Sequence, residues 1–294
     1  MLTGRPLVVD SYEPHAEAMV ENGAWRKGGI AFRTLFLFEK LQSKRARAVI
    51  AAAEGMQDYA LSAYGHVPSR FLVKPACVDL DRFSERNVKD PALLKELGLE
   101  RKLVAVYAGK FGGIYLDQEA FDLFRVARDR WGPRFHVLIL SPHQPDALLP
   151  YMQQAGLDPA LFTIRFVSHE RIPDYLGLGD FAITPVKPVP TKRYCSLSRT
   201  GNIGRWGLPV VITPDISEDS GLIVNAGVGA IMDPARPESY TEAIAQIDRL
   251  LTLHSKSELY AKVRPLAETH RNFYIARAAY QAVYGEMKSG GHLP

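Results

Sequence analysis

The residues best suited to chemistry lie in a polar stretch over 193–211, which reads RYCSLSRTGNIGRWGLPVV. Its chemically useful side chains are three hydroxyls and a guanidinium, namely Ser196, Ser198, Thr200 and Arg199. The order of residues predicts a loop, a short helix over about 198–206, a glycine stop and a buried strand. Free N–H groups at a helix start, with hydroxyls and a cation beside them, suit an anion such as a phosphate. Taken alone, the stretch favours the simpler interpretation of a capped helix with Arg199 in solvent.

A second stretch, VYAGKFGG over 106–113, places glycines directly after an apolar run. Glycines let a backbone approach a ligand closely, and Lys110 adds a point charge. The stretch matches neither the dinucleotide fingerprint nor a P-loop, so an ordinary strand–helix turn is the common alternative. The positions of the two stretches favour a ligand-binding site, because both follow strands of one predicted parallel sheet and open on the same edge of it. We therefore expect Lys110 and Arg199 to clamp one pyrophosphate. The glycines of the turn are Gly109, Gly112 and Gly113.

Alternating strands and helices must position these loops. Strands are expected at 103–108, 135–140, 162–166, 181–184 and 209–212. Helices are expected near 118–130, 146–155, 171–176, 198–206, 219–225 and 238–251. Parallel strands joined by right-handed crossovers form a doubly wound α/β domain, which binds ligands beyond the carboxyl ends of its strands.

The chain before residue 102 shows a shorter version of this alternation. Strands are expected at 7–9, 48–50 and 70–74, with helices at 16–21, 29–45 and 54–64. Three strands are few for an α/β domain of about 100–150 residues, so this part is typical of the back half of one. The Pro-led segment 75–83 indicates an interdomain connection. We expect an incomplete N-terminal α/β domain with its linker over 1–84 and a doubly wound domain over 85–270.

The last part of the chain, 271–294, is expected to form a helix over about 271–287 and a frayed tail. We expect this helix to pack back toward the N-terminal part. We interpret its aromatic residues as a packing face, and they are Phe273, Tyr274, Tyr280 and Tyr284.

Composition limits the class of protein. The 294 residues are 47% apolar and 23% charged, as in globular proteins, and the formal net charge is +4. That charge permits an anionic ligand or a peripheral membrane contact, but no basic stripe typical of nucleic-acid binding is present. Two cysteines make no disulfide framework and lack metal-ligand spacing, which fits a cytoplasmic location. The N-terminal apolar run is too short for a signal peptide.

Residues 70–285 resemble the donor half of retaining, nucleotide-sugar-dependent glycosyltransferases with the two-domain GT-B fold, family 4, also called group 1. The segments that carry the resemblance are VKPACVDLDRF, YAGKFGG, YCSLSRTGNIGRWGLPVV and PDISEDSGLIVNAGVGAIM. The resemblance implies a GT-B-like fold with a nucleotide-sugar donor domain over 85–270. It also implies transfer of a sugar to a glycan, lipid-linked or small-molecule hydroxyl with retention of configuration. No metal or other cofactor is expected. Polysaccharide biosynthesis in the cytoplasm or at the inner face of the membrane is the implied setting.

The resemblance implies roles for individual residues. Lys110 and Arg199 would bind the diphosphate, and Ser168 would lie near the nucleobase. His15 follows the strand that in this family carries a cleft histidine near the transferred sugar, although a surface histidine in a proline turn fits equally well. Lys110, Arg199 and His15 are thus the candidate catalytic residues. The remaining residues of the implied donor pocket are Gly109, Gly112, Gly113, Ser196, Ser198, Thr200 and Asn202.

Three features depart from the family pattern. Asn202 occupies the position of a glutamate that hydrogen-bonds donor hydroxyls, and Leu197 replaces a proline. The strands and the glycine-rich loop that open the family's N-terminal domain have no counterpart here. The lack of these strands and this loop fits three explanations: the sequence is a fragment, its start is assigned too far downstream, or the enzyme is split and a separate chain supplies the other half. The alternatives are therefore a non-catalytic or partner-dependent nucleotide-sugar-binding subunit and, less favoured, a sugar-nucleotide epimerase.

Overall fold

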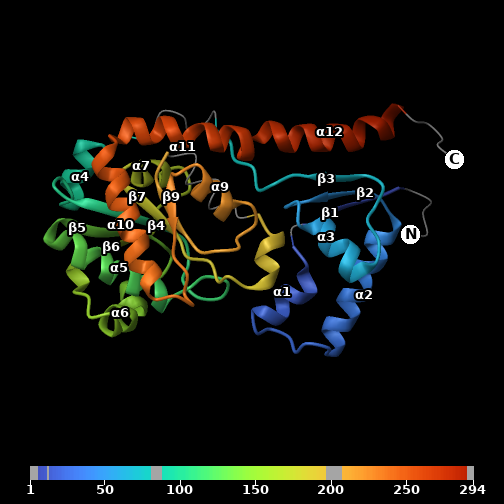
Figure 1. Ribbon diagram of the computed structural model, residues 1–294, viewed down its shortest axis with the longest axis horizontal. Coiled ribbons are helices and arrows are strands. Elements are labelled where there is room, and N and C mark those ends of the chain that lie inside the picture. The colour runs from blue at the N-terminus through green and yellow to red at the C-terminus, as the bar shows by residue number, and fades with distance from the viewer. Residues whose placement is uncertain (1–5, 12, 81–87, 197–206, 290–294) are drawn as a thin grey trace.

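Two parallel sheets organise the chain, and the computed structural model describes residues 6–11, 13–80, 88–196 and 207–289. The first sheet has the strand order β1-β2-β3 and the second has the order β6-β5-β4-β7-β8-β9 (Figure 1). The strands are β1 (Leu7–Ser11), β2 (Ala46–Ala51), β3 (Phe71–Val73), β4 (Leu103–Ala108), β5 (Phe135–Leu140), β6 (Phe162–Arg165), β7 (Phe181–Thr184), β8 (Val210–Ile212) and β9 (Gly229–Ile231). Every strand pairing among these residues is parallel. The predicted doubly wound α/β architecture is confirmed, with a smaller sheet beside it.

The six-stranded sheet is buried on both faces because successive side chains point to opposite sides of each strand. In β4, Ala105 and Tyr107 join one core cluster, whereas Val104 and Val106 join the other. The first face is covered by helices α5 (Gln118–Trp131), α6 (Pro145–Gln154) and α10 (Glu238–Leu253). The second face is covered by the shorter helices α4 (Pro91–Leu97), α7 (Ile172–Leu176) and α9 (Asp219–Asn225). These two layers hold the strand ends, and the loops that follow them, in fixed positions.

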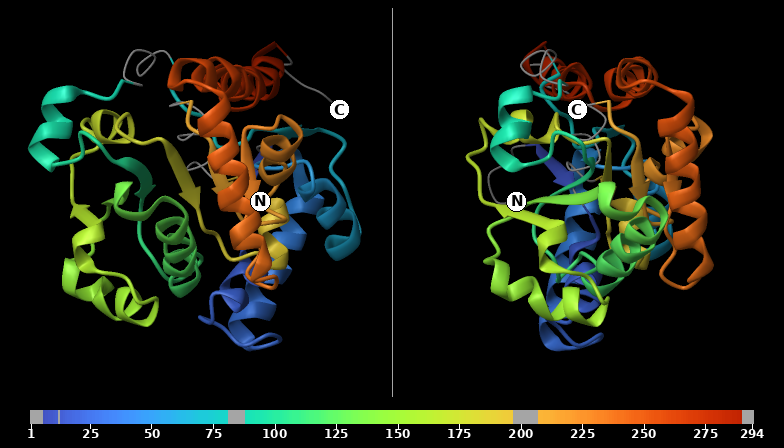
Figure 2. Two further views of the ribbon diagram at one scale, coloured as in Figure 1. Left: turned by 60° about the vertical axis from the view of Figure 1, so that its left-hand side comes forward. Right: turned by 90° about the vertical axis from the view of Figure 1, so that its left-hand side faces the viewer.

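The three-stranded sheet is also covered on both faces. Val49 packs with the helical turns α3 (Met56–Tyr59) and η1 (Ala60–Tyr64), near α1 (His15–Glu21) and α2 (Ile30–Arg45). On the other face, Ile50 packs against Ala279 and Val283 of α12 (Phe273–Ser289). In every view α12, in red, runs along one side of the molecule (Figures 1 and 2). The last helix thus supplies one layer of a sheet formed by the first third of the chain.

A segment of the expected connection lies against the end of α11 (Lys256–Arg271). The Val78 amide donates a hydrogen bond to the Arg271 carbonyl at 2.7 Å, and Val78 forms a short parallel bridge with Asn272. Val78, Leu80 and Ala267 are buried together in a small apolar cluster. This cluster fixes the path of the chain between its two sheets.

The prediction that the aromatic residues of the last helix form its packing face is wrong. Phe273, Tyr274 and Tyr284 are 51%, 61% and 47% exposed, because the side chains that face the sheet are the smaller Ala279 and Val283. Among the four aromatics, Tyr280 packs at the edge of that contact. Small residues allow a helix to approach a sheet closely, so the aromatic count alone gave the wrong face.

Some elements were not predicted from the sequence. Helix α11 contains Pro265, which disfavours a helix interior, yet its start carries a capping box formed by Ser255 and Glu258. Strand β9 is only three residues long, too short for a periodic signal. The predicted helix over 198–206 lies outside the described residues. In the described part of the chain, no helix is both long and apolar enough to cross a membrane.

Candidate functional site at the carboxyl edge of the six-stranded sheet

The glycine turn directly follows β4. Gly109, Gly112 and Gly113 have positive φ angles of 147°, 79° and 65°. Residues with a Cβ rarely adopt such angles, so the chain reverses here only because glycine occupies these positions. Within this tight turn the side chain of Lys110 is exposed, which leaves its ammonium accessible to a ligand.

Contacts beneath the turn hold it rigidly. The Tyr107 hydroxyl donates a hydrogen bond to the Lys110 carbonyl, and the Tyr107 and Phe111 rings lie 4.4 Å apart. The Phe111 amide donates to His143 Nε2 at 3.1 Å, and His143 lies in the loop after β5. An accepting Nε2 requires that nitrogen to be unprotonated. The turn is therefore anchored to β4, which precedes it, and to the loop that follows the neighbouring strand β5.

The loop after β7 meets the glycine turn. The Leu116 amide donates to the Pro185 carbonyl at 2.8 Å, and Tyr115 forms an antiparallel bridge with Val186. Strands β4 and β7 are parallel neighbours, so their loops leave the same edge of the sheet. Pro185 and Val186 precede the stretch over 193–211, so the predicted convergence of Lys110 and Arg199 on one diphosphate stays a prediction. Residues Ser198, Arg199, Thr200 and Asn202 lie outside the described residues, so their binding roles stay predictions.

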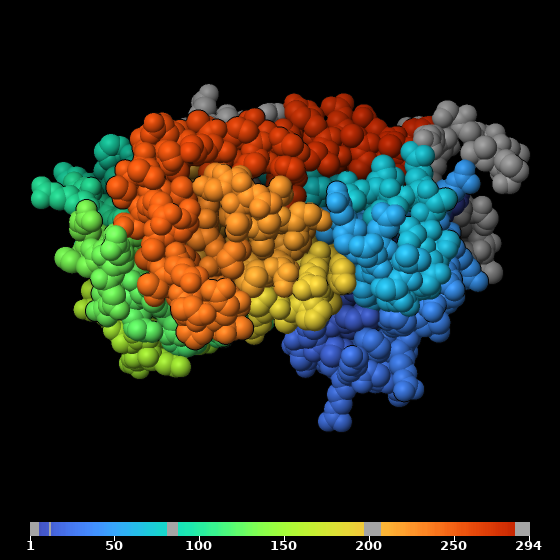
Figure 3. Space-filling model, viewed as in Figure 1, coloured from blue at the N-terminus to red at the C-terminus, as the bar shows by residue number. Residues whose placement is uncertain are grey.

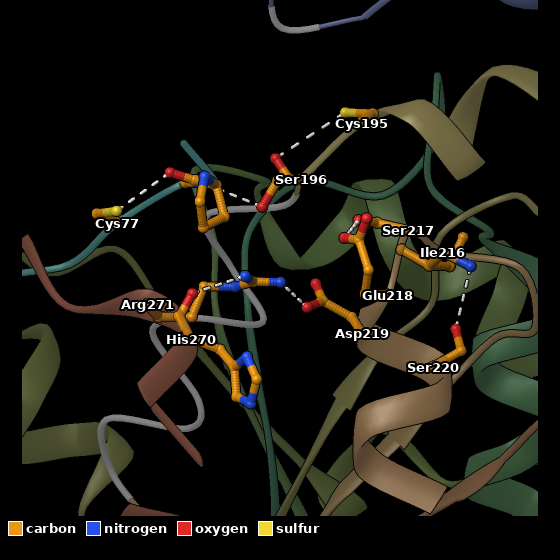
Figure 4. A network of polar contacts seen from close by, with 12 residues as sticks. Cys77, Cys195, Ser196, Ile216, Ser217, Glu218, Asp219, Ser220, His270 and Arg271 are labelled. Atoms are coloured by element: carbon orange, nitrogen blue, oxygen red, sulfur yellow. Dashed lines mark hydrogen bonds and ion pairs between the residues drawn. The ribbon is translucent and has the colours of Figure 1, made fainter. Parts of the chain in front are cut away.

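Ser196 lies where this loop reaches the connection between the sheets. Its hydroxyl accepts a hydrogen bond from the Ala76 amide at 2.9 Å, and the residue is buried (Figure 4). The neighbouring thiols of Cys77 and Cys195 are free, and burial raises the pKa of Cys195 to about 11. A thiol with so high a pKa is a poor nucleophile at neutral pH. Ser196 therefore anchors the loop by its side chain.

The loop after β8 forms a further wall of this edge. Asp215 and Ser217 have positive φ angles of 58° and 47°, which are costly for residues other than glycine. The Ser217 amide donates to the Lys192 carbonyl at 2.9 Å, which joins this loop to the one after β7. The Thr213 hydroxyl donates to the Val186 carbonyl at 2.6 Å and strengthens the same junction. Strained backbone held by such contacts is a common feature of binding sites.

A buried ion pair lies behind this wall. The Arg271 guanidinium donates to Asp219, and both side chains are less than a tenth exposed (Figure 4). Burial lowers the pKa of Arg271 from its ordinary value. The second carboxylate oxygen of Asp219 has no hydrogen-bond partner among the described residues. The pair links the start of α9 to the end of α11, so it braces the loop from the rear.

Polar contacts also join this edge to the N-terminal part, and the sequence analysis missed them. Lys192 Nζ lies 2.7 Å from Glu13 Oε2, and the Thr191 amide donates to Glu21 at 3.1 Å. The Glu54 amide donates to Glu218 Oε1 at 2.9 Å. These partners are 164 to 179 residues apart, so no spacing in the sequence signals them. The surface is indented where the two parts meet (Figure 3).

His15 lies in the N-terminal part, at the first position of α1. Its side chain is exposed and borders a cavity of about 470 Å³. Its backbone amide donates to Glu39 Oε1 at 3.0 Å, and Glu39 lines the same cavity. Burial raises the pKa of Glu39 to about 7. Within the part of the chain that the structure describes, no hydrogen bond or ion pair joins His15 to Lys110, so a shared catalytic role stays a prediction.

Ser168 is exposed in the loop after β6, at the same edge of the sheet. Strand β6 lies two strands from β4 in the sheet order. The Ser168 carbonyl accepts the Arg171 amide at 2.9 Å, which fixes the turn before α7. Within the described ranges, no group of three or more His, Cys, Asp or Glu side chains is placed to hold a metal ion.

This architecture has solved counterparts among glycosyltransferases. The crystal structure of HepE from Anabaena in complex with UDP and glucose matches with a TM-score of 0.70 at 14% identity, over 97% of this chain and 72% of that chain. WaaG, a glycosyltransferase involved in lipopolysaccharide biosynthesis, matches with a TM-score of 0.68 at 14% identity, over 95% of this chain and 78% of that chain. A glycosyltransferase from Rickettsia africae matches with a TM-score of 0.66 at 14% identity, over 88% of this chain and 68% of that chain. No family model and no curated protein matches the sequence. The chain therefore has the fold of the GT-B glycosyltransferases.

Proposed function

We propose that this protein is a retaining glycosyltransferase of the family 4 type that uses a nucleotide-diphosphate sugar as donor. The proposed acceptor is a hydroxyl of a glycan, a lipid-linked sugar or a small molecule. Synthesis of a polysaccharide, on the cytoplasmic side and in peripheral contact with the membrane, is the corresponding setting. The proposal rests on the site at the carboxyl edge of the six-stranded sheet and on the sequence segments that resemble the family.

One observation carries the proposal. The glycine turn after β4 and the loop after β7 meet through the Tyr115–Val186 bridge and the Leu116–Pro185 hydrogen bond. Ligands bind at this edge in doubly wound sheets, and HepE has been solved with UDP and with UDP-glucose. A diphosphate placed there would approach Lys110, and Arg199 lies three residues beyond the described end of the loop.

The proposed chemistry needs little more than fixed positive charge. The bond between the anomeric carbon and the diphosphate breaks, and its electron pair goes to the diphosphate. The acceptor oxygen bonds to that carbon on the same face, and its hydroxyl proton passes to the departing diphosphate. Negative charge develops on the departing diphosphate, where Lys110 and Arg199 would stabilise it. Groups held in place before the reaction stabilise such charge without further reorganisation.

Calorimetry with UDP tests the assignment. We expect saturable binding to the wild-type chain and weaker binding to Lys110→Ala and to Arg199→Ala, because each variant removes one charge from the diphosphate. UDP affinity unchanged in both variants would eliminate this site. NMR of the product sugar then tests the stereochemistry, because retention requires the anomeric configuration of the donor.

A second candidate is a partner-dependent nucleotide-sugar-binding subunit. Among the described residues, β1 is an edge strand of its sheet, and the nearby helix α2 exposes Ile30, Leu37 and Phe38. An open edge beside exposed apolar side chains is suited to pairing with a further α/β segment, which a separate chain would supply. Saturable UDP binding without transfer or hydrolysis by the purified chain alone would favour this candidate over the enzyme.

A further inference from the structure

A different pocket lies at the opposite edge of the six-stranded sheet. Its volume is about 350 Å³, and its walls include residues just before β4 and just before β8. These are the amino ends of the strands, whereas the donor loops follow the carboxyl ends. The cationic or basic side chains that line this basic pocket are Arg101, Lys102, Arg134, His254 and Lys256.

The charges in the basic pocket are unbalanced. Asp180 is the one carboxylate among its lining residues. That carboxylate already accepts hydrogen bonds from the Lys89 ammonium at 2.6 Å and from the Val104 amide at 2.8 Å. Its negative charge is therefore shared between Lys89, which lies outside the pocket lining, and Lys256. The arginines and lysines of the lining leave a net positive cavity.

The two lysines donate hydrogen bonds to neutral backbone carbonyls, and Asp180 acts on the charge of Lys256. Lys102 Nζ donates to the Pro133 carbonyl at 2.7 Å, and Lys256 Nζ donates to the Gly179 carbonyl at 2.5 Å. Burial lowers the pKa of Lys256 to about 8, because its charged form loses solvation there. A bound anion would offset that penalty.

The two arginines are exposed at the mouth of the cavity. In the part of the chain that the structure describes, neither Arg101 nor Arg134 forms an ion pair. A guanidinium presents its N–H donors in a planar fork that fits two oxygens of a phosphate. The two exposed arginines and the two lysines line the same space, so a phosphate bound there would contact both kinds of cation.

We propose that the basic pocket binds a phosphate-bearing anion at a second site, separate from the donor edge. A concave site of this volume suits a small ligand, whereas a nucleic acid requires an extended basic stripe. The phosphate has two possible sources, a free phosphorylated molecule or the headgroup of an anionic lipid. The inference does not depend on the proposed transferase activity.

Calorimetry with inorganic pyrophosphate tests the proposal on the full chain saturated with UDP, so that the donor edge is filled. We expect saturable binding, weakened at least tenfold in the double variant R101E/R134E. The charge-matched control is the double variant R125E/R128E, which replaces two exposed arginines of α5 outside the pocket lining and should change the affinity less than twofold. Unaltered UDP affinity in R101E/R134E would show that the variant is folded.

Two further arms separate the remaining outcomes. Should UDP fail to bind, the same titration is made with Lys110→Ala, and a pyrophosphate signal lost only in R101E/R134E still supports the second site. Sedimentation with phosphatidylglycerol vesicles tests the lipid source, which is supported if only vesicle binding depends on Arg101 and Arg134. The proposal is overturned if neither probe binds, or if the double variant binds both as the wild type does.

Discussion

The ammonium of Lys192 lies 2.7 Å from the carboxylate of Glu13, and the Lys192 side chain is only 1% exposed. The two residues are 179 positions apart, and they join the loop after β7 to the N-terminal part. A buried charge is tolerated when it is paired, and it destabilises the fold when its partner is removed. This ion pair therefore makes the position of the loop after β7 depend on the N-terminal part of the chain.

Removing the two partners of this pair should have unequal costs. Glu13→Ala leaves the buried Lys192 ammonium unpaired and should lower the free energy of unfolding by about 3–5 kcal/mol. Lys192→Met should cost less, because Glu13 is 21% exposed and its carboxylate can contact water. Urea denaturation of both variants measures the difference. Equal losses would show that the ion pair is not what determines stability here.

Substitution of the proposed diphosphate ligands should reduce turnover. We expect Lys110→Ala and Arg199→Ala each to lower kcat for sugar transfer by about 10²–10³, the usual effect of removing one group that stabilises a developing anion. Lys95→Ala, which removes an exposed lysine of α4, is the matched control and should leave kcat unchanged. A similar loss in all three variants would indicate a general charge effect.

Gly207 should resist replacement for two reasons. Its φ angle is +64°, and a Cβ there would lie 2.6 Å from the Tyr260 Cα, a backbone atom that cannot rotate away. Gly98 has a similar φ of +67° but nothing within 4 Å of the added atom. Gly98→Ala should thus cost only the conformational strain of about 1–2 kcal/mol. Gly207→Ala should cost about 1–3 kcal/mol more because of overpacking. Thermal or urea unfolding of the pair checks this order.

Glu39 should make stability depend on pH. Burial raises its pKa from 4.5 to about 7, so between these values the folded chain binds more protons than the unfolded chain. The free energy of unfolding should therefore fall as pH rises through this window, with the full contribution below pH 4.5 and the loss complete above about 7. Since the side chain is only partly buried, we expect a fall of about 1–2 kcal/mol.

Comparison of variants isolates this contribution. Glu39→Gln should flatten the profile, because an amide does not titrate, whereas the exposed control Glu100→Gln should keep the wild-type slope. Urea denaturation at pH 5 and pH 7.5 measures the slope for each chain. A wild-type slope in Glu39→Gln would assign the titration to other groups.

Much of the fold follows from local pattern in the sequence. Strands such as β4 and β5 are continuous apolar runs, and α5 and α10 have apolar faces at helical spacing, so the predicted doubly wound sheet was confirmed. The glycine turn after β4 was predictable for the same reason, since glycine and lysine follow the strand directly. Helix α11 was missed although Ser255 and Glu258 mark its start. Pro265 obscured its helical pattern.

Taken together, the sequence determined which segments form strands and helices and which polar loops follow the strands, because these depend on neighbours within a few residues. The tertiary structure alone decided that Lys192 pairs with Glu13, that Ser196 is anchored to Ala76, and that Ala279 and Val283 rather than the aromatics pack α12 on the first sheet. It also brought Arg101, Arg134 and Lys256 to one cavity. Such contacts arise between segments far apart in the chain, where packing and charge compensation in three dimensions leave no periodic trace in the sequence.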